Sequence, residues 1–305
     1  MTRYLIGTGG WAYFPGKPSL KAYSKVFDFV EVNSTFYQYP DARRVEFWRK
    51  NVPKEFTFSV RCHRDLTHRI GLKTSDEAYD VFSRMIGICR ILGAPFLHFE
   101  TPASYVLNGE AVKHAKAFFS TVNLKNVRLA WEVRGHLTPE TVKLMQDFGI
   151  VHCVDLSRET PSLKSDVIYT RLFGRGKLNM YQFTDEELME IDEKMEASQV
   201  KIAFLSYHGV RMNSDAMRFK AYKQTGEFLP VTGQTGTESA RAVLSEDAKF
   251  PSTRAELLAD QGWKVVDLTE DKRIHLSEML SGLPEIRYNS LDELVQAMRL
   301  LYGQG

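Results

Sequence analysis

The stretch FTFSVRCHRDLTH, residues 56–68, begins as a strand with one apolar face and ends among ionisable side chains. Apolar residues occupy every second position, namely Phe56, Phe58, Val60 and Cys62. Arg61 and His63 hold the opposite parity, so they share the other face of the strand. Such a strand fits two places. It can lie on the surface of a sheet with its charged face in water, or in the wall of a barrel with that face turned into a shared interior.

Similar short apolar runs recur along the chain and predict eight strands. They cover residues 4–11, 27–37, 56–63, 94–100, 127–135, 150–157, 166–174 and 201–209. Segments with helical periodicity lie between several of them, at residues 74–92, 109–121, 138–148, 185–197 and 214–225. About eight strand–helix units over roughly 210 residues predict an α/β fold of the (β/α)8 TIM barrel type, with an open doubly wound sheet as the alternative. We expect the barrel over residues 1–235 and a small C-terminal α/β appendage over residues 236–305.

Composition and charge place the chain among ordinary globular proteins. Of its 305 residues, 43% are hydrophobic and 26% are charged, and the net charge of +2 gives no whole-protein argument for nucleic acid or anionic membranes. The three cysteines are far apart and form no CxxC pair, so neither a disulfide framework nor a zinc ribbon is expected. No apolar run reaches membrane-spanning length, and the N-terminal run is too short for a signal peptide. We expect a cytoplasmic protein that does not contact membranes.

Strand parity places ionisable residues of most strands on the interior face of the predicted barrel. The inward set comprises Glu31, Asn33, Arg61, His63, His98, Glu100, Glu132, Arg134, Cys153, Asp155, Arg171, Ser206 and His208. These residues lie toward the C-terminal ends of their strands, which is where TIM barrels build ligand sites. The alternative is a purely structural network, in which the inward carboxylates and guanidiniums only pair with one another.

Several segments resemble domain-of-unknown-function family 72, the YecE-like proteins. The resemblance rests on IGTGGW (6–11), FDFVEVNSTFYQYP (27–40), FSVRCHRDLTH (58–68), LAWEVRG (129–135) and YTRLFGR (169–175), and it covers about residues 4–210. It implies a TIM barrel but no established reaction, and the family's barrel is likened to endonuclease IV and sugar isomerases at the level of fold alone. The chain departs from the family pattern at Arg61, where a lysine is usual, and at the ends of the fourth, seventh and eighth strands. A shared substrate therefore does not follow from the resemblance.

The residues favour an enzyme that binds an anionic or phosphorylated small molecule, either a hydrolase or an isomerase. Guanidiniums hold phosphate or carboxylate by paired hydrogen bonds, and the candidates are Arg61, Arg134, Arg171 and Arg175. Glu31 or Glu132 would act as general base, with His63 as the acid–base partner. Further substrate contacts are predicted from Thr8, Trp11, Asn33, Tyr37, Asp155 and His208.

Two other functions fit parts of the sequence. A metal-dependent phosphodiesterase of the endonuclease IV type would use nitrogen and oxygen ligands, the candidates being His63, His98, Glu132, Asp155 and His208, although no ligand-spacing motif is present. A non-catalytic nucleic-acid-binding module would use two basic tracts, residues 61–73 and 211–223. The sequence contains no phosphate-binding loop, dinucleotide-binding glycine motif or serine nucleophile elbow, so it names no cofactor.

Overall fold

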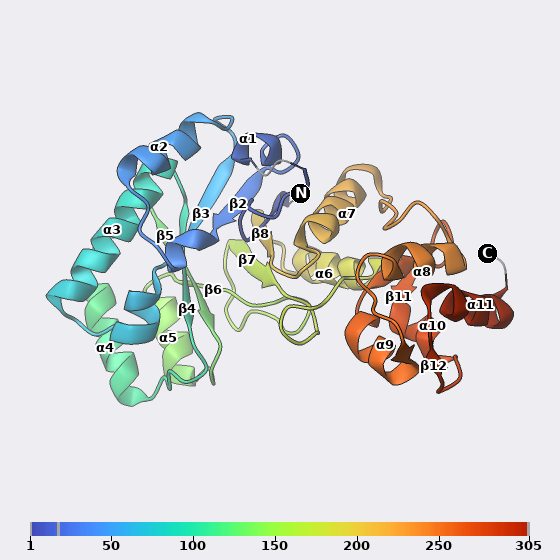
Figure 1. The fold of residues 1–305 in the computed structure, drawn as a ribbon. Helices are drawn as coiled ribbons and strands as arrows, with labels where there is room; N and C mark the ends of the chain where they lie inside the picture. The colour runs from blue at the N-terminus through green and yellow to red at the C-terminus, as the bar shows by residue number, and fades with distance from the viewer. Residues whose placement is uncertain (1, 17–18, 304–305) are drawn as a thin grey trace. The chain divides into compact units, whose positions relative to one another are not determined.

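A sheet of eight parallel strands forms the centre of the computed structural model, which describes residues 2–16 and 19–303 (Figure 1). The strands are β1 (Arg3–Thr8), β2 (Phe29–Val32), β3 (Thr57–Arg61), β4 (Phe96–Thr101), β5 (Arg128–Val133), β6 (Val151–His152), β7 (Val167–Leu172) and β8 (Ile202–Tyr207). They are hydrogen-bonded in the order β6-β5-β4-β3-β2-β1-β8-β7, and a parallel bridge between Val154 and Thr170 joins the segment after β6 to β7. Because strand and helix alternate and the two ends of the sheet meet, the predicted (β/α)8 TIM barrel is confirmed.

Helices follow most of these strands. They are α1 (Leu20–Tyr23), α2 (Ala42–Lys50), α3 (Asp76–Leu92), α4 (Gly109–Thr121), α5 (Pro139–Asp147), α6 (Asp185–Ala197) and α7 (Met212–Thr225). The side chains of Asp41, Ser75 and Asn108 accept hydrogen bonds from backbone amides at the starts of α2, α3 and α4, which satisfies donors that a helix leaves unpaired. Figure 1 shows α2 to α5 outside strands β2 to β5. The interior of the barrel is therefore left to the inward-facing side chains of the strands.

Apolar side chains fill the N-terminal half of the barrel interior. Phe29, Phe96 and Phe204 belong to one buried cluster, and the ring centroid of Phe204 lies 5.5 Å from that of Phe29 and 5.0 Å from that of Phe96. Glu31 and His98 follow Phe29 and Phe96 by two residues, so they share the interior face one layer nearer the C-terminal ends of the strands. The polar residues therefore stand on a packed aromatic floor.

The chain divides into two compact units, and the first, Met1–Leu172 with Lys194–His208, holds all eight barrel strands. The second unit is Phe173–Glu193 with Gly209–Gly305. Its further elements are α8 (Gly236–Leu244), β9 (Ser252–Thr253), α9 (Arg254–Gln261), β10 (Val265–Asp267), β11 (Arg273–His275), α10 (Leu276–Ser281), β12 (Arg287–Tyr288) and α11 (Leu291–Tyr302). The predicted domain boundary at residue 235 stays a prediction, because compactness does not show which segments fold independently. Among the described residues, no helix has the length and apolar character needed to span a membrane.

Most strands end before their sequence patterns do, and the second and sixth differ by the most. The second ends at Val32 because residues Asn33–Phe36 form a helical turn, in which the Thr35 hydroxyl donates to the carbonyl of Val32 at 2.6 Å. The sixth ends at His152, and Asp155 lies beyond it in a local turn. There the Asp155 carboxylate accepts from the backbone amide of Ser157 at 3.0 Å and from its hydroxyl at 2.6 Å. Such local hydrogen bonds compete with strand pairing.

Candidate functional site

Arg171 on β7 is the centre of an ion-pair network at the C-terminal ends of the strands. Its Nη1 lies 2.7 Å from Glu100 Oε2 and 2.6 Å from Glu132 Oε2, and its Nε lies 3.2 Å from Glu31 Oε1. The three carboxylates come from β4, β5 and β2, so one guanidinium connects four strands. Three carboxylates around one buried cation require further positive charge, because uncompensated buried charge is costly.

Arg61 on β3 and Arg134 after β5 supply that charge. Arg61 Nη2 lies 2.7 Å from Glu100 Oε2, and its Nη1 donates to Asn33 Oδ1 at 2.7 Å. Arg134 Nε lies 2.9 Å from Glu132 Oε1, and its Nη2 lies 3.3 Å from Glu100 Oε2. The network therefore balances three carboxylates with three guanidiniums. We call Glu31, Arg61, Glu100, Glu132, Arg134 and Arg171 the barrel cluster.

The barrel cluster is buried unequally. The side chains of Arg171 and Glu31 are 2% and 0% exposed, whereas that of Glu132 is 14% exposed and that of Arg134 is 43% exposed. Both of the more exposed side chains come from the end of β5. A solute can therefore reach the cluster along one edge, formed by Glu132 and Arg134.

Electrostatics keep the carboxylates of the cluster ionised. Burial alone would raise the pKa of Glu31 and of Glu132, but the Arg171 guanidinium and neighbouring imidazoles outweigh it and hold both pKa values well below the usual range. The pKa of Glu100 is lowered as well, because Arg171 and Arg61 offset its burial and the repulsion from Glu132. All three carboxyl groups are therefore ionised at neutral pH.

His208 adds a neutral imidazole beside the cluster. Its Nε2 lies 3.3 Å from Glu31 Oε1 and 3.2 Å from Arg171 Nε. Burial first, and then the charge of Arg171, lower the pKa of His208 to about 4, so the ring is neutral at physiological pH. The glycine at position 9 makes room for this ring, because a Cβ there would stand 2.3 Å from His208 Cε1. Gly9, directly after β1, is therefore needed for the packing of His208 in the site.

His98 on β4 lies between two carboxylates of the cluster. Its Nε2 is 3.5 Å from Glu132 Oε2, and its Nδ1 is 3.9 Å from Glu31 Oε2. The ring is fully buried and stacks on Tyr169, with centroids 5.6 Å apart. Burial, followed by the charge of Arg171, lowers the pKa of His98 as well, so this imidazole is also neutral.

The structure brings together part of the predicted site. The predicted residues that meet are Glu31, Asn33, Arg61, Glu132, Arg134, Arg171 and His208, and His98 of the predicted metal ligands lies among them. His63 has other partners: its ring stacks on Tyr39 with centroids 3.9 Å apart, and its Nδ1 lies 3.2 Å from Asp65 Oδ2. Asp155 is held by the turn described above. A metal site that uses His63, Asp155 and His208 together with His98 does not match these contacts.

The other four residues predicted to contact a substrate each have separate local contacts in the structure. The Thr8 hydroxyl donates to the carbonyl of Gly10 at 2.7 Å, so it shapes the glycine-rich loop. Trp11 packs edge-on against Trp48, with ring centroids 5.3 Å apart. Tyr37 is exposed on the turn after β2. In the second unit, Arg175 pairs with Glu187 at 3.4 Å and Glu190 at 2.9 Å. Contacts between these four residues and a substrate stay predictions.

Sequence reasoning missed two hydroxyl groups that belong to the site. The Tyr169 hydroxyl donates to Glu31 Oε2 at 2.8 Å, and Ser59 Oγ lies 2.7 Å from the same hydroxyl. Tyr169 and Ser59 precede Arg171 and Arg61 by two residues, so strand parity could have placed both on the interior face. The signal was weak because tyrosine and serine also occur in strands without any role in a site.

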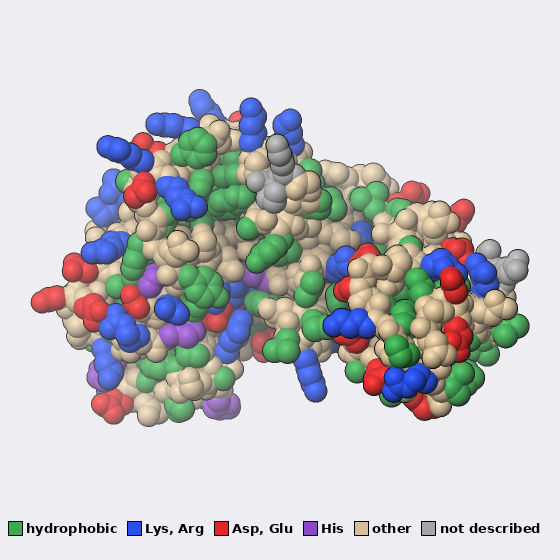
Figure 2. Space-filling model, viewed as in Figure 1, with side chains coloured by type: hydrophobic (Ala, Val, Ile, Leu, Met, Phe, Trp, Pro, Cys, Tyr) green, Lys and Arg blue, Asp and Glu red, His purple; other side chains and the backbone are tan. Residues whose placement is uncertain are grey.

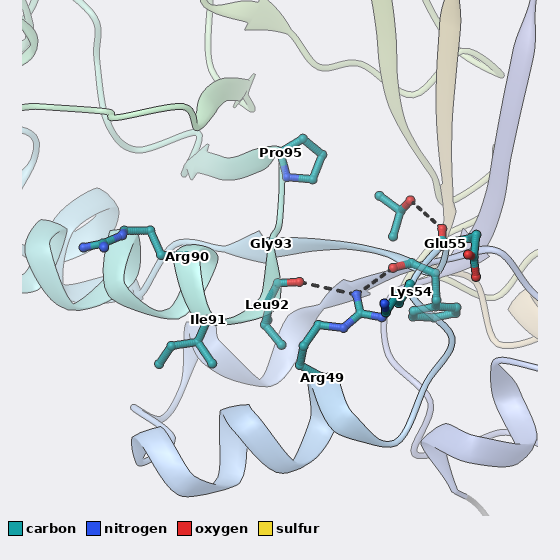
Figure 3. A pocket seen from close by; sticks show the side chains of 10 residues that line it. Arg49, Lys54, Glu55, Arg90, Ile91, Leu92, Gly93 and Pro95 are labelled. Carbon is teal, nitrogen blue, oxygen red and sulfur yellow. Dashed lines mark hydrogen bonds between the residues drawn. The ribbon is translucent and has the colours of Figure 1, made fainter.

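A surface pocket of about 470 Å³ lies at the opposite end of the barrel (Figure 3). Its lining includes Arg49, whose Nη1 donates to the carbonyl of Phe56 at 2.8 Å, and Pro95. Phe56 and Pro95 immediately precede β3 and β4, so this pocket lies at the N-terminal ends of the strands. Residues at that end of TIM barrels generally serve stability rather than catalysis. The barrel cluster therefore remains the candidate functional site.

Comparison with known proteins identifies the family. The family model described as "Protein of unknown function DUF72" matches residues 5–229, which include the whole barrel cluster. The UPF0759 protein YunF of Bacillus subtilis (strain 168) is 31% identical over 101 residues, which cover 30% of this chain and 35% of that protein's own length. A solved DUF72 family protein from Enterococcus faecalis V583 superposes with a TM-score of 0.58 at 15% identity, covering 73% of this chain and 98% of that one. The chain therefore belongs to the DUF72 family.

Proposed function

We propose that the chain is an enzyme that binds an anionic small molecule, such as a phosphate ester or a carboxylate, at the exposed edge of the barrel cluster. The observation that carries this proposal is the pair at the end of β5. There, the half-exposed guanidinium of Arg134 stands beside the partly exposed carboxylate of Glu132, above charges that are fully buried. A cation that can contact a ligand and an ionised proton acceptor thus lie 2.9 Å apart.

Arg134 is the group best placed to contact an anion. A guanidinium offers five N–H donors in a fixed plane and binds phosphate or carboxylate through pairs of them. Arg61 and Arg171 are buried and directed at carboxylates of the cluster, so they act on a ligand through their electric field rather than by contact. A bound anion would compete with Glu132 and Glu100 for Arg134.

Anion binding would activate Glu132 as a base. A carboxyl whose pKa is held far below the usual range is a weak proton acceptor. A ligand anion that draws Arg134 toward itself weakens one of the interactions that lower the pKa of Glu132, and it adds negative charge nearby. Both effects raise the pKa of Glu132 toward the working pH. The base then suits either activation of water, as in a hydrolase, or removal of a proton from carbon, as in an isomerase.

His208 is better placed than His63 to assist in proton transfer. Its neutral imidazole lies against Glu31 and Arg171 and can donate one hydrogen bond without carrying a charge. A neutral imidazole of this kind can polarise a substrate oxygen. His63 instead stacks on Tyr39 and pairs with Asp65, so its contacts tie it to the segment after β3.

Nucleic-acid binding is the second candidate, and a different surface supports it. In the predicted tract 211–223, Arg218 is buried 2.5 Å from Asp185, and Lys223 pairs with Asp192 at 2.8 Å. In the predicted tract 61–73, Arg64, Arg69 and Lys73 are exposed. Further exposed basic side chains lie on α2 at Arg43, Arg44 and Lys50, in a part of the surface where Figure 2 shows Lys and Arg gathered. A salt-dependent gel shift with mixed DNA and RNA oligonucleotides tests this candidate. A triple charge reversal on α2 should abolish any shift that depends on it.

Isothermal titration calorimetry of the full chain against a panel of sugar phosphates and inorganic phosphate tests the proposed anion site. We expect Arg134→Ala to weaken binding by at least about 10-fold, since hydrogen bonds to charged groups contribute about 1.5–3 kcal/mol. Arg158→Ala is the matched control, because Arg158 is also about half exposed and faces a carboxylate, that of Asp155 at 3.6 Å. It should change affinity by less than about 2-fold.

Proton transfer is tested by incubating each bound compound in D2O and following C–H exchange and hydrolysis by NMR. We expect Glu132→Gln to stop the reaction while the compound still binds, because the amide cannot accept the proton. The proposal fails if no anion in the panel binds at millimolar concentration. It also fails if Arg134→Ala and Arg158→Ala weaken binding equally, or if Glu132→Gln retains the wild-type exchange rate.

A further inference from the structure

His98 has two ring nitrogens without hydrogen-bond partners inside the barrel. Its side chain is fully buried, and both Nδ1 and Nε2 are inaccessible and unpaired. The nearest carboxylate oxygen, Glu132 Oε2, is 3.5 Å away, which is long for a hydrogen bond. Leaving a buried polar group unsatisfied costs about 1–3 kcal/mol, so such groups ordinarily have a partner. Arg61 Nε of the barrel cluster is also without a hydrogen-bond partner, but among the described side chains His98 is the one residue that leaves two buried polar atoms unpaired, which calls for a ligand.

Cys153 completes a set of metal-binding atoms around this ring. One ligand atom each from His98, Glu132 and Cys153 lies within 4.8 Å of the other two. The three residues come from β4, from β5 and from the position directly after β6, so neighbouring segments of the barrel wall hold them. Sequence parity pointed Cys153 inward, but the cysteine was not among the predicted metal ligands.

The chemistry of this set favours a borderline-soft cation. A tetrahedral zinc ion with bonds of about 2.0–2.3 Å separates its ligand atoms by roughly 3.5 Å, and His98 and Glu132 are already 3.5 Å apart. Imidazole, thiolate and carboxylate together are typical of zinc and related transition metals, whereas magnesium and calcium prefer oxygen. Three protein ligands leave a fourth position for water or substrate, which is the arrangement of catalytic zinc sites.

The charges around His98, Glu132 and Cys153 are compatible with a bound cation. Arg171 Nη1 lies 2.6 Å from the same oxygen of Glu132 and opposes a cation. Glu31 and Glu100 stand around that guanidinium and offset it. Coordination also replaces the proton of the Cys153 thiol, which leaves for solvent, so the thiolate cancels one of the two positive charges of the ion.

We propose that His98, Glu132 and Cys153 bind one divalent transition-metal ion of the zinc type, with its open position toward the exposed edge of the barrel cluster. This inference deepens the proposed function, with which it shares Glu132. With the ion bound, Glu132 is a ligand, and metal-bound water takes over as proton acceptor or nucleophile toward the anionic substrate. Hydrolysis of a phosphate ester is then the expected reaction class.

Cobalt(II) is the probe for this site, because it takes the place of zinc and absorbs visible light. Metal-stripped full chain is titrated with CoCl2 and followed by absorption. We expect one equivalent to produce the d–d bands of a tetrahedral ion and a thiolate-to-cobalt charge-transfer band, and ZnCl2 to abolish both. Cys153→Ala should remove the charge-transfer band and weaken binding by more than about 100-fold, since even second-shell substitutions cost 10–100-fold. Cys89→Ala is the matched control, a buried cysteine in α3, and should leave the titration unchanged.

His98→Gln provides a second variant in case Cys153→Ala does not fold, as judged by circular dichroism. It should weaken cobalt binding by a similar factor while the chain keeps its thermal transition. The proposal is overturned if the wild type binds no cobalt, if the charge-transfer band survives Cys153→Ala, or if His98→Gln binds cobalt as the wild type does. Phosphate titration of the metal-free chain, with the Arg134→Ala comparison, reports separately on the anion site. If the chain binds cobalt but not phosphate, the proposed anion site is wrong. If it binds phosphate but not cobalt, the proposed metal site is wrong.

Discussion

The barrel cluster and a second set of buried charges use the same residue types to different effect. We call Asp185, Asp215, Arg218, Asp267 and Arg273 the second-unit cluster. Asp185 joins its two arginines, with Oδ1 2.5 Å from Arg218 Nη2 and Oδ2 2.9 Å from Arg273 Nη1. Arg273 Nε lies a further 3.0 Å from Asp267 Oδ1. All five side chains are buried, so this cluster has no edge that a solute can reach.

The two clusters differ in what their guanidiniums bind besides carboxylates. In the second-unit cluster, Arg218 donates to the carbonyl of Phe183 at 2.6 Å and Arg273 to that of Glu270 at 2.8 Å, so the charges hold main-chain segments in place. In the barrel cluster, the guanidiniums contact carboxylates that come from several strands. One of them, that of Arg134, is half exposed. We infer that a charge network that binds the backbone and is closed to solvent serves stability. A network that opens at one side chain can also serve a ligand.

Removal of a central arginine should have the largest effect in either cluster. Arg171→Met leaves three carboxylates facing one another in the barrel, and we expect it to lower the free energy of unfolding by about 3–5 kcal/mol. Arg218→Met in the second unit should cost a similar amount for the same reason. Arg134→Met is the control and should cost less than about 1 kcal/mol, because its ion pairs are half exposed. Urea unfolding followed by circular dichroism measures all three, and a cost below 1 kcal/mol for Arg171→Met contradicts the central role of that residue.

His208, beside the barrel cluster, and Asp215, in the second-unit cluster, should make the stability of the chain depend on pH with opposite sign. The pKa of His208 is lowered from its ordinary 6.5 to about 4, so between these values the unfolded chain binds a proton that the folded chain does not. Its contribution to stability is therefore present above pH 6.5 and is lost as the pH falls toward 4. Burial raises the pKa of Asp215 from 3.8 to about 7, so there the folded chain binds the extra proton. Its contribution is present below pH 3.8 and is lost as the pH rises toward 7.

Thermal melts of two variants between pH 4 and pH 8 separate these contributions. His208→Gln should flatten the loss of stability on acidification, by at most about 3 kcal/mol. Asp215→Asn should make the chain more stable relative to the wild type at pH 8 than at pH 4, because the neutral amide removes the cost of ionising a buried carboxyl. If the melting temperatures of both variants change with pH in parallel with that of the wild type, this prediction is wrong. Glu31, Glu100 and Glu132 also have lowered pKa values, so a loss of stability below their usual pKa range persists in both variants.

A smaller effect is expected where Gly9 contacts His208 beside the barrel cluster. Gly9→Ala places a methyl group 2.3 Å from the His208 ring, and we expect the displaced ring to cost about 1–3 kcal/mol. Gly87→Ala is the control, because that glycine lies within α3 and a Cβ there meets no atom within 4 Å. It should stabilise the chain by about 0.5–1 kcal/mol through the better helix propensity of alanine. Equal melting temperatures for the two variants would show that His208 does not need the space at position 9.

The barrel and much of its polar interior could be predicted from the sequence. Alternation within the runs that hold Glu31, Arg61, Glu132 and Arg171 depends only on neighbours along the chain, and the structure places all four side chains together. His63 was predicted to join these side chains, but its ring contacts Tyr39 and Asp65. Its parity was inward, but β3 ends at Arg61, so the alternation no longer applies two residues later. For Asp155, a local hydrogen-bonded turn had the same effect after the short sixth strand.

Local patterns in the amino-acid sequence were sufficient to predict the period of each strand, the alternation of strands with helices, and hence the (β/α)8 barrel with charged residues at the C-terminal ends of its strands. The three-dimensional contacts were needed to show which charges meet, that His98 is left with unpaired nitrogens, and that Cys153 lies beside His98 and Glu132. This difference arises because periodicity is a property of adjacent residues. The partner of a buried side chain is instead set by strand register, by where each strand stops, and by contacts between residues far apart in the chain.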